Sequence, residues 1–321
     1  MPKKTKAIVL LSGGLDSILA ARVLQEQGIE VIGICLESPF FGCEKAKKAA
    51  EQLKIELKIV KLGEDYINMV KKPKHGYGSA INPCIDCHAF MLKKAKSLMP
   101  KLKADFIATG EVFNERPMSQ NLESLKIVEE ESGLKGKLLR PLSAKLLAET
   151  EAEKKGIVNR SKLLDIKGRS RQRQMELAER YGLEYPSPGG GCLLCEPDMA
   201  AKLSDLFKHK ETDEVSLALL NAGRHFRFKG QIIVGRNKKE NDELEILGKS
   251  WIKLECKDIV GPVTIIKKDK NLKKAAELTA HYADSDKMKK VKVIFWKKSR
   301  KDSKEIEANI PSQAEVEELR V

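Results

Sequence analysis

A short glycine-containing turn, residues 12–17 with the sequence SGGLDS, constrains this chain more than any other feature. It follows an apolar run over residues 7–11 that is typical of a fully buried parallel strand. After the turn, apolar residues repeat at helical spacing until Gly28, which predicts a helix end. A strand, a Ser/Gly turn and a helix start together present backbone N–H groups and hydroxyls to an anion. The pattern therefore predicts a phosphate-binding loop, although an ordinary strand–helix turn has the same outline.

Strand-like and helix-like stretches continue to alternate along the first half of the chain. Strands are expected at 29–36, 55–59 and 104–108, and helices at 43–54, 89–99, 143–156 and 161–181. This alternation predicts an α/β domain with a doubly wound, mainly parallel sheet and right-handed crossovers. In such sheets the ligand lies beyond the C-terminal strand ends. Ser12, Glu37 and Gly110 follow three of these strands, so one site can use all three.

The length of the chain and a Pro/Gly-rich segment indicate a second domain. A chain of 321 residues can form two domains, each with its own core. The segment 186–191 reads PSPGGG and marks the approach to a boundary that we place near residue 205. We therefore expect a first domain over residues 1–205 and a smaller α+β domain over residues 206–321.

The charge balance points to a polyanionic partner. The formal net charge is +14, one third of the residues are charged and few are aromatic. An excess of Lys and Arg attracts phosphates, although the Lys/Glu-rich surface of a heat-adapted protein would look similar. No stretch approaches the roughly 18 to 20 apolar residues of a membrane span, and the first apolar run is not a signal peptide because the glycine turn continues it. We expect a cytoplasmic protein with a nucleic-acid partner and no membrane.

Four of the seven cysteines form two Cys-x-x-Cys pairs, Cys84 with Cys87 and Cys192 with Cys195. Such thiolates suit a four-thiolate zinc site, an iron–sulfur cluster with one open iron, or a redox pair in which one cysteine carries a persulfide. The two pairs are far apart in the chain, so the fold would have to bring them together. The other three cysteines are expected to be buried as small apolar side chains, without disulfides: Cys35, Cys43 and Cys256.

Four motifs together resemble one enzyme family. They are SGGLDS, PCIDC at 83–87, ADFIATGEV with the following RPMSQ at 104–120, and RPLSAK at 140–145. The chain resembles the tRNA-thiolating branch of the PP-loop ATP pyrophosphatases, the 4-thiouridine synthetases and 2-thiouridylases, which have an adenine nucleotide alpha hydrolase-like fold. The resemblance implies that ATP adenylates a uridine carbonyl oxygen in tRNA and releases pyrophosphate. A sulfur donor, sulfide or a persulfide carrier, would then give 4-thiouridine or 2-thiouridine.

The resemblance also implies roles for single residues. ATP and its pyrophosphate would be held by Ser12, Gly13, Gly14, Asp16, Ser17 and Gly110. Asp16 would lie near Mg²⁺ and count among the catalytic residues. The other catalytic residues would be the three metal ligands of a [4Fe-4S] cluster, Cys84, Cys87 and Cys192. Cys195 looks like an addition to the family pattern, and as a fourth ligand it would close the site and favour zinc.

The C-terminal sequence resembles a different family. Residues 231–244, Trp251 and residues 258–263 look like the RNA-binding domain of the NFACT ribosome quality-control proteins, over roughly residues 211–300. Phe226, Phe228 and Trp251 are interpreted as core residues, with base stacking as the alternative. The basic residues expected at RNA are Arg116, Arg169, Arg171, Arg173, Arg224, Arg236 and Lys238, with His225, Arg227 and Lys239 near the last three.

The sequence thus predicts an ATP-dependent tRNA sulfurtransferase. Two alternatives from other classes remain open: a PP-loop enzyme that acts on a small molecule or amidates a base, and a non-catalytic RNA-binding protein with a four-cysteine zinc site. Arg116 and Lys145 are further candidates for contacts with phosphate, while Glu37, Asp86 and His88 are polar residues near the expected site. The modified nucleotide, the sulfur donor and a possible homodimer are not determined by the sequence.

Overall fold

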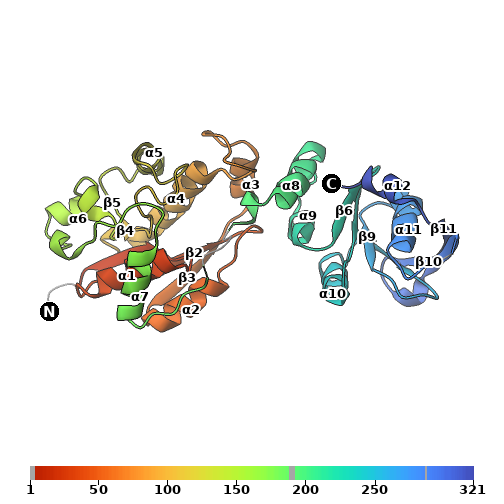
Figure 1. The fold of residues 1–321 in the computed structure, drawn as a ribbon, viewed down its shortest axis with the longest axis horizontal. Coiled ribbons are helices and arrows are strands. Elements are labelled where there is room, and N and C mark those ends of the chain that lie inside the picture. Colours follow the sequence, from red (N-terminus) through yellow and green to blue (C-terminus); the bar gives the residue numbers. More distant parts are fainter. Residues whose placement is uncertain (1–3, 188–191, 286–287) are drawn as a thin grey trace. The chain divides into compact units, whose positions relative to one another are not determined.

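The computed structural model describes residues 4–187, 192–285 and 288–321 (Figure 1). The chain divides into two compact units, Met1–Glu196 and Pro197–Val321. The sequence analysis placed the boundary near residue 205, which lies inside helix α8 (Pro197–His209). The division therefore falls before this helix, which belongs to the second unit.

The first unit is built on a five-stranded parallel sheet, which confirms the predicted α/β class. Its order is β3-β2-β1-β4-β5. The strands are β1 (Lys6–Leu10), β2 (Glu30–Glu37), β3 (Glu56–Lys61), β4 (Phe106–Ala108) and β5 (Leu138–Leu139). In the central strand β1, Val9 pairs with Gly33 of β2 and Ala108 of β4. The ends of these three strands therefore lie side by side, as the site requires.

Helices cover both faces of this sheet (Figure 1). One core holds Ala7 and Val9 of β1 together with α1 (Leu15–Gln25), α2 (Glu44–Leu53) and α7 (Gln172–Arg180). The other core holds Ile8 with α4 (Cys84–Leu102) and α5 (Leu122–Ser132), and α3 (Glu64–Lys71) packs beside α4. Strand β1 is buried on both faces, which explains its unbroken apolar sequence.

Several helices differ from the prediction. Helix α4 begins at Cys84 instead of residue 89, so PCIDC forms its first turn. The expected helices 143–156 and 161–181 are reduced to α6 (Glu151–Lys154) and α7, with one short 3-10 turn before α6 and another between α6 and α7. The N–H of Leu164 donates to Pro141 O (3.0 Å) and that of Ile166 to Leu142 O (2.8 Å), which holds this segment extended. Backbone hydrogen bonds to residues 141 and 142 thus prevent a helix here, although the apolar residues repeat at helical spacing.

The three isolated cysteines are buried as expected, but two of them are bonded to each other. Cys35 near the end of β2 forms a disulfide with Cys43, the residue before α2. The expectation that the chain has no disulfide is therefore wrong for this pair, because a β-strand end and a helix start approach within 6.0 Å between Cα atoms. Cys256 lies free in the second unit.

The second unit contains a six-stranded antiparallel sheet in the order β11-β10-β8-β9-β7-β6. Its strands are β6 (Arg224–Arg227), β7 (Gln231–Val234), β8 (Ile252–Cys256), β9 (Thr264–Ile266), β10 (Lys290–Trp296) and β11 (Lys304–Asn309). The accompanying helices are α8, α9 (Glu214–Ala218), α10 (Lys238–Leu247), α11 (Leu272–His281) and α12 (Gln313–Glu317). Side chains of α11 and of the sheet form its larger core, in agreement with the predicted α+β class.

Among the residues that the structure describes, no helix is both long enough and apolar enough to cross a membrane.

Candidate active site

The predicted phosphate-binding turn is closed by its own hydroxyls and by tight backbone packing. Ser12 Oγ lies 3.2 Å from Ser17 Oγ, and Ser17 Oγ donates to Gly14 O at 2.9 Å. Gly13 has φ +78°, and a Cβ there would lie 2.2 Å from the carbonyl carbon of Lys45. Because both the backbone angle and the space exclude a side chain, this position requires glycine.

Gly110 brings the end of β4 against the same turn. A Cβ on Gly110 would lie 2.5 Å from Ser17 N and 2.6 Å from Asp16 C. The two segments that the sequence analysis assigned to ATP are therefore in direct contact, and glycine permits that approach.

Asp16 has the properties of a cation ligand. Burial, with help from the negative Glu115, raises the pKa of its carboxyl to about 6. Its Oδ1 is buried without a hydrogen-bond partner, while Oδ2 lies 3.9 Å from Arg171 Nη2. A carboxylate oxygen without a partner beside a phosphate-binding turn fits the oxygen coordination of Mg²⁺.

Arg171 is fixed beside the turn by Glu115. Its Nε and Nη2 donate to Glu115 Oε1 at 2.9 and 2.8 Å, and the buried Gln174 donates to Oε2 at 3.3 Å. Arg171 was expected at RNA, but it lies half-buried next to Asp16. This position favours a contact with the phosphates of a nucleotide.

The two cysteine pairs come together at the start of α4. Cys84 and Cys87 lie on its first turn, while Cys192 directly precedes the short 3-10 turn Leu193–Cys195 and Cys195 ends it. The N–H of Leu193 donates to Phe40 O at 3.2 Å, which anchors the second pair.

The thiols lie close enough to affect one another's ionisation. Burial raises the pKa of Cys87 and of Cys192 to about 12 each, and the neighbouring thiols, Cys84 among them, add to both shifts. Within the described residues, no group of three or more His, Cys, Asp or Glu side chains has converged into a metal-binding arrangement. The glycines 189–191 that precede Cys192 lie outside the described residues.

Two polar side chains contact the first pair, and the sequence analysis missed both. Tyr66 Oη lies 3.2 Å from Cys87 Sγ, and Asn82 Nδ2 donates to Cys84 Sγ at 3.3 Å. Tyr66 is fully buried, and burial with the nearby Cys87 raises its pKa above the usual range. It therefore stays protonated and can donate to an anionic sulfur. No spacing rule in the sequence connects residue 66 of α3 with residue 87.

Asp86 has a different role from the expected one. Its two oxygens accept the backbone N–H groups of Lys74 and His75, each at 3.0 Å. Asp86 therefore fixes the loop before α4 through these two hydrogen bonds.

A buried ionic group supports the end of β4. Glu111 accepts from Arg140 Nε at 3.0 Å and from Thr109 Oγ1 at 2.9 Å, and its Oε1 lies 2.9 Å from His88 Nδ1. Burial alone would raise the pKa of Glu111, but Arg140 and His88 hold it well below its usual range. Arg140 also pairs with Glu129, so the RPLSAK motif contributes its arginine to the core.

Arg116 links the turn to the thiols. Burial raises the pKa of both Asp16 and Cys195, and the positive charge of Arg116 opposes the shift at both groups. The exposed Arg116 is therefore within electrostatic range of the phosphate-binding turn and of the cysteine group. The other predicted residues here are less central: Arg173 pairs with Asp165 at 2.7 Å, and Lys145 and Arg169 are exposed.

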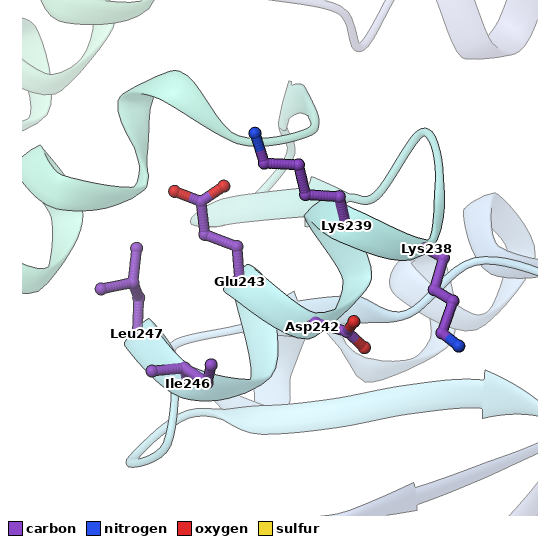
Figure 2. Close-up of a pocket in the computed structure, with 6 residues that line it drawn as sticks. All are labelled: Lys238, Lys239, Asp242, Glu243, Ile246 and Leu247. Atoms are coloured by element: carbon purple, nitrogen blue, oxygen red, sulfur yellow. The ribbon is translucent and has the colours of Figure 1, made fainter.

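In the second unit, most of the basic residues expected at RNA are bonded internally. Arg224 lies over the Tyr282 ring and donates to Gly235 O at 3.2 Å, and Arg236 pairs with Glu240 at 2.6 Å. Lys238 projects from the first turn of α10, where an open pocket also contains acidic and apolar side chains (Figure 2). The mixed charge of that pocket does not favour a polyanion.

The neighbouring His225 is buried and neutral, and Arg227 is held in ion pairs. Burial lowers the pKa of His225 to about 4, which leaves it neutral, and Arg227 pairs with Asp205 and Glu211. Neither is available to a phosphate.

Comparison with known proteins identifies both units. Residues 5–148 match the family model described as the tRNA methyl transferase HUP domain, the class that the parallel sheet and its Ser/Gly turn define. Residues 223–320 match the NFACT protein RNA binding domain. The chain therefore carries a HUP domain of the PP-loop kind followed by an NFACT RNA-binding domain, and both resemblances seen in the sequence are confirmed.

Curated relatives match part of the chain. The chain is 35% identical over 133 residues to the tRNA-specific 2-thiouridylase MnmA of Karelsulcia muelleri, covering 37% of this chain and 34% of that protein. It is 33% identical over 144 residues to a probable tRNA sulfurtransferase of Thermococcus kodakarensis, covering 43% and 36%. The chain thus spans about a third of the length of these relatives.

A solved structure, a 4-thiouridine synthetase–RNA complex with bound ATP, matches at 19% identity and a TM-score of 0.36. The match covers 65% of this chain and 54% of that one.

Proposed function

We propose that this chain is an ATP-dependent tRNA sulfurtransferase. The observation that carries the proposal is the position of Arg116, whose charge acts both on Asp16 in the phosphate-binding turn and on Cys195 in the thiol group. The turn that is predicted to bind phosphate and the thiols therefore lie within reach of one side chain on the same unit. The names of the curated relatives, which are tRNA-thiolating enzymes, support the same reaction.

The turn carries the activation step. Backbone N–H groups of residues 13–17 and the two serine hydroxyls bind the β- and γ-phosphates, and Gly110 lets the end of β4 pack directly against this turn. Mg²⁺ on the unpartnered Asp16 oxygen would neutralise phosphate charge. The uridine carbonyl oxygen bonds to the α-phosphorus and pyrophosphate leaves. Arg116 and Arg171 stabilise the charge that develops.

The thiol group carries the sulfur step. Hydrosulfide from the donor attacks the activated uridine carbon, a C–S bond forms, and the C–O bond breaks so that AMP leaves with the former carbonyl oxygen. His88 lies one helical turn after Cys84 and is oriented by Glu111, so it can accept the hydrosulfide proton. Tyr66 and Asn82 stabilise negative charge on the cysteine sulfurs.

The thiol set fits a metal group by the chemistry of its donors, since cysteine thiolates suit iron–sulfur clusters or zinc. We propose that Cys84, Cys87 and Cys192 hold a [4Fe-4S] cluster, which would supply an open iron for sulfide. Cys195 is the most exposed of the four and is left outside this set.

The experiment is a reconstituted reaction. Anaerobically purified protein is incubated with ATP–Mg²⁺, sulfide and an unmodified tRNA transcript, and the digested nucleosides are analysed by mass spectrometry. We expect thiouridine from the wild type and from the control Asp165→Asn, but not from Asp16→Asn. Absence of thiouridine from wild-type protein that binds both ATP and tRNA would refute the proposal.

A further inference from the structure

An exposed aromatic residue stands out at the turn between β6 and β7. Phe228 is 44% exposed, whereas Phe226 (0%) and Trp251 (3%) are buried in the cores of the second unit. The core interpretation of these three residues is therefore confirmed for two of them and wrong for Phe228. Side chains alternate between the two faces of a strand, so Phe228 would lie on the same buried face as Phe226 if the strand continued. Strand β6 ends at Arg227, and Phe228 therefore lies in the turn.

Two lysines flank the Phe228 ring. Lys229 Nζ lies 5.5 Å and Lys274 Nζ 5.9 Å from its centroid, both at cation–π distance. Lys274 is held in place by Glu277 at 2.5 Å, while Lys229 is exposed and belongs to the turn itself. An aromatic face with two ammonium groups near it matches a base and the phosphates next to that base.

The turn is rigid. The N–H of Phe228 donates to Gly230 O at 3.2 Å, and Gly230 is buried so closely that a Cβ there would lie 2.7 Å from Asn271 Nδ2. The preceding Arg227 is fixed by Asp205 and Glu211. The ring is therefore presented by an ordered turn, which lowers the entropy cost of binding a ligand on it.

The segment beside the turn adds positive charge. Asn271 contacts Gly230, and its neighbours in the chain include the exposed Lys268, Lys270 and Lys273. The acidic side chains on this segment are Asp269, which is exposed, and Glu277, which Lys274 already neutralises. The surroundings of Phe228 thus remain strongly basic.

We propose that Phe228, Lys229 and Lys274 form a binding site for an unpaired RNA nucleotide. The base stacks on the ring, the Lys229 ammonium moves from the ring to a phosphate, and Lys274 contacts the next phosphate. Stacking requires a base that is free of its own helix, so the site selects single-stranded segments over duplex. This inference rests on the proposed function in so far as the RNA is the substrate tRNA.

The test measures RNA binding by the full chain with fluorescence anisotropy, using a single-stranded RNA oligonucleotide and a duplex of equal length. We expect Phe228→Ala to weaken single-strand binding roughly 5- to 100-fold, the range of one stacking contact, and to change duplex binding much less. Phe228→Trp should restore binding. Ile246→Ala, at a 71% exposed site on α10, is the matched control and should bind like the wild type.

Salt dependence separates the lysines from the ring. Lys229→Gln should reduce the slope of log affinity against log salt by about 0.7, whereas Phe228→Ala should leave it unchanged. Wild-type single-strand affinity in Phe228→Ala, or an equal loss for duplex, would overturn the inference. The thiouridine assay on the same variants keeps the two proposals apart: a protein that binds RNA through Phe228 but makes no thiouridine refutes only the sulfurtransferase, and the converse refutes only this site.

Discussion

The phenol oxygen of Tyr66 lies 3.2 Å from the sulfur of Cys87, so a fully buried thiol of the cysteine group has a polar partner. Burial raises the pKa of Cys87 to about 12, and the Tyr66 hydroxyl works in the opposite direction. Formation of an anionic or metal-bound sulfur at this position therefore depends on Tyr66.

Tyr66→Phe should impair the sulfur step and leave activation by ATP intact. Loss of the hydrogen bond removes about 1–3 kcal/mol of stabilisation from the thiolate. We expect slower thiouridine formation with unchanged affinity for ATP–Mg²⁺. Tyr77→Phe is the matched control, because the Tyr77 hydroxyl donates to the backbone oxygens of Val70 and Lys71 and does not contact a cysteine. Equal loss in both variants would mean that Tyr66 acts only on stability.

Asp16→Asn should stabilise the first unit at neutral pH. The folded protein holds a proton on Asp16 up to about pH 6, while the unfolded chain releases it near 3.8, so stability falls as pH rises between these values. Removing the titration should raise stability above pH 6 by at most about 3 kcal/mol. Calorimetric melting of nucleotide-free protein at pH 4 and pH 8 measures the difference.

The control for this prediction is a carboxyl group whose pKa is shifted in the opposite direction. Arg173 lowers the pKa of Asp165, so Asp165→Asn should not raise stability at pH 8. A melting temperature of Asp16→Asn below that of the wild type at pH 8 would contradict the cost assigned to burial of the charge.

Gly110→Ala should disable the phosphate-binding turn. Its Cβ would meet backbone atoms of Asp16 and Ser17 at 2.5–2.7 Å, and backbone cannot move aside without shifting the turn. A displacement of about 1 Å at such a site costs about 100-fold in rate. Gly42→Ala, where a Cβ has nothing within 4 Å, should bind ATP–Mg²⁺ and release pyrophosphate like the wild type. Normal pyrophosphate release by Gly110→Ala would show that ATP activation does not require this turn.

Serine substitutions distinguish the roles of the four thiols. The three-ligand proposal predicts that single Cys→Ser changes at positions 84, 87 and 192 abolish both the visible absorbance of the cluster and thiouridine formation, whereas Cys195→Ser retains both. Loss of bound metal in all four variants, with zinc in the wild-type protein, would instead show a closed four-thiolate site. Metal analysis and absorbance spectra of anaerobically purified protein give the answer.

The sequence predicted those features of the fold that depend on local pattern. The buried run at residues 7–11 and the SGGLDS turn identified β1 and the start of α1, and the pattern of residues 55–59 identified β3. It failed where the folded backbone decides: residues 163–166 are extended because they bond to residues 141–142. It also missed the disulfide between Cys35 and Cys43, which are only 8 residues apart but are joined because the end of β2 and the start of α2 meet.

The same division applies to the candidate site. Cys-x-x-Cys spacing identified all four thiols, and their meeting in the structure required the fold. Tyr66 and Asn82 carry no local signature, and the motifs that contain Glu111 and Arg140 do not reveal that these two side chains form a buried pair. For the basic residues of the second unit, the sequence does not reveal that Arg227 and Arg236 form internal ion pairs, and their contact with RNA stays a prediction.

The central claim is that ATP activates the uridine carbonyl oxygen itself. The most direct measurement is the fate of that oxygen in a tRNA whose target uridine carries ¹⁸O at the carbonyl. The account predicts that each thiouridine formed is accompanied by one AMP containing ¹⁸O, because the C–O bond of the adenylate breaks. Thiouridine formed with unlabelled AMP, or with the ¹⁸O released to water, would contradict it.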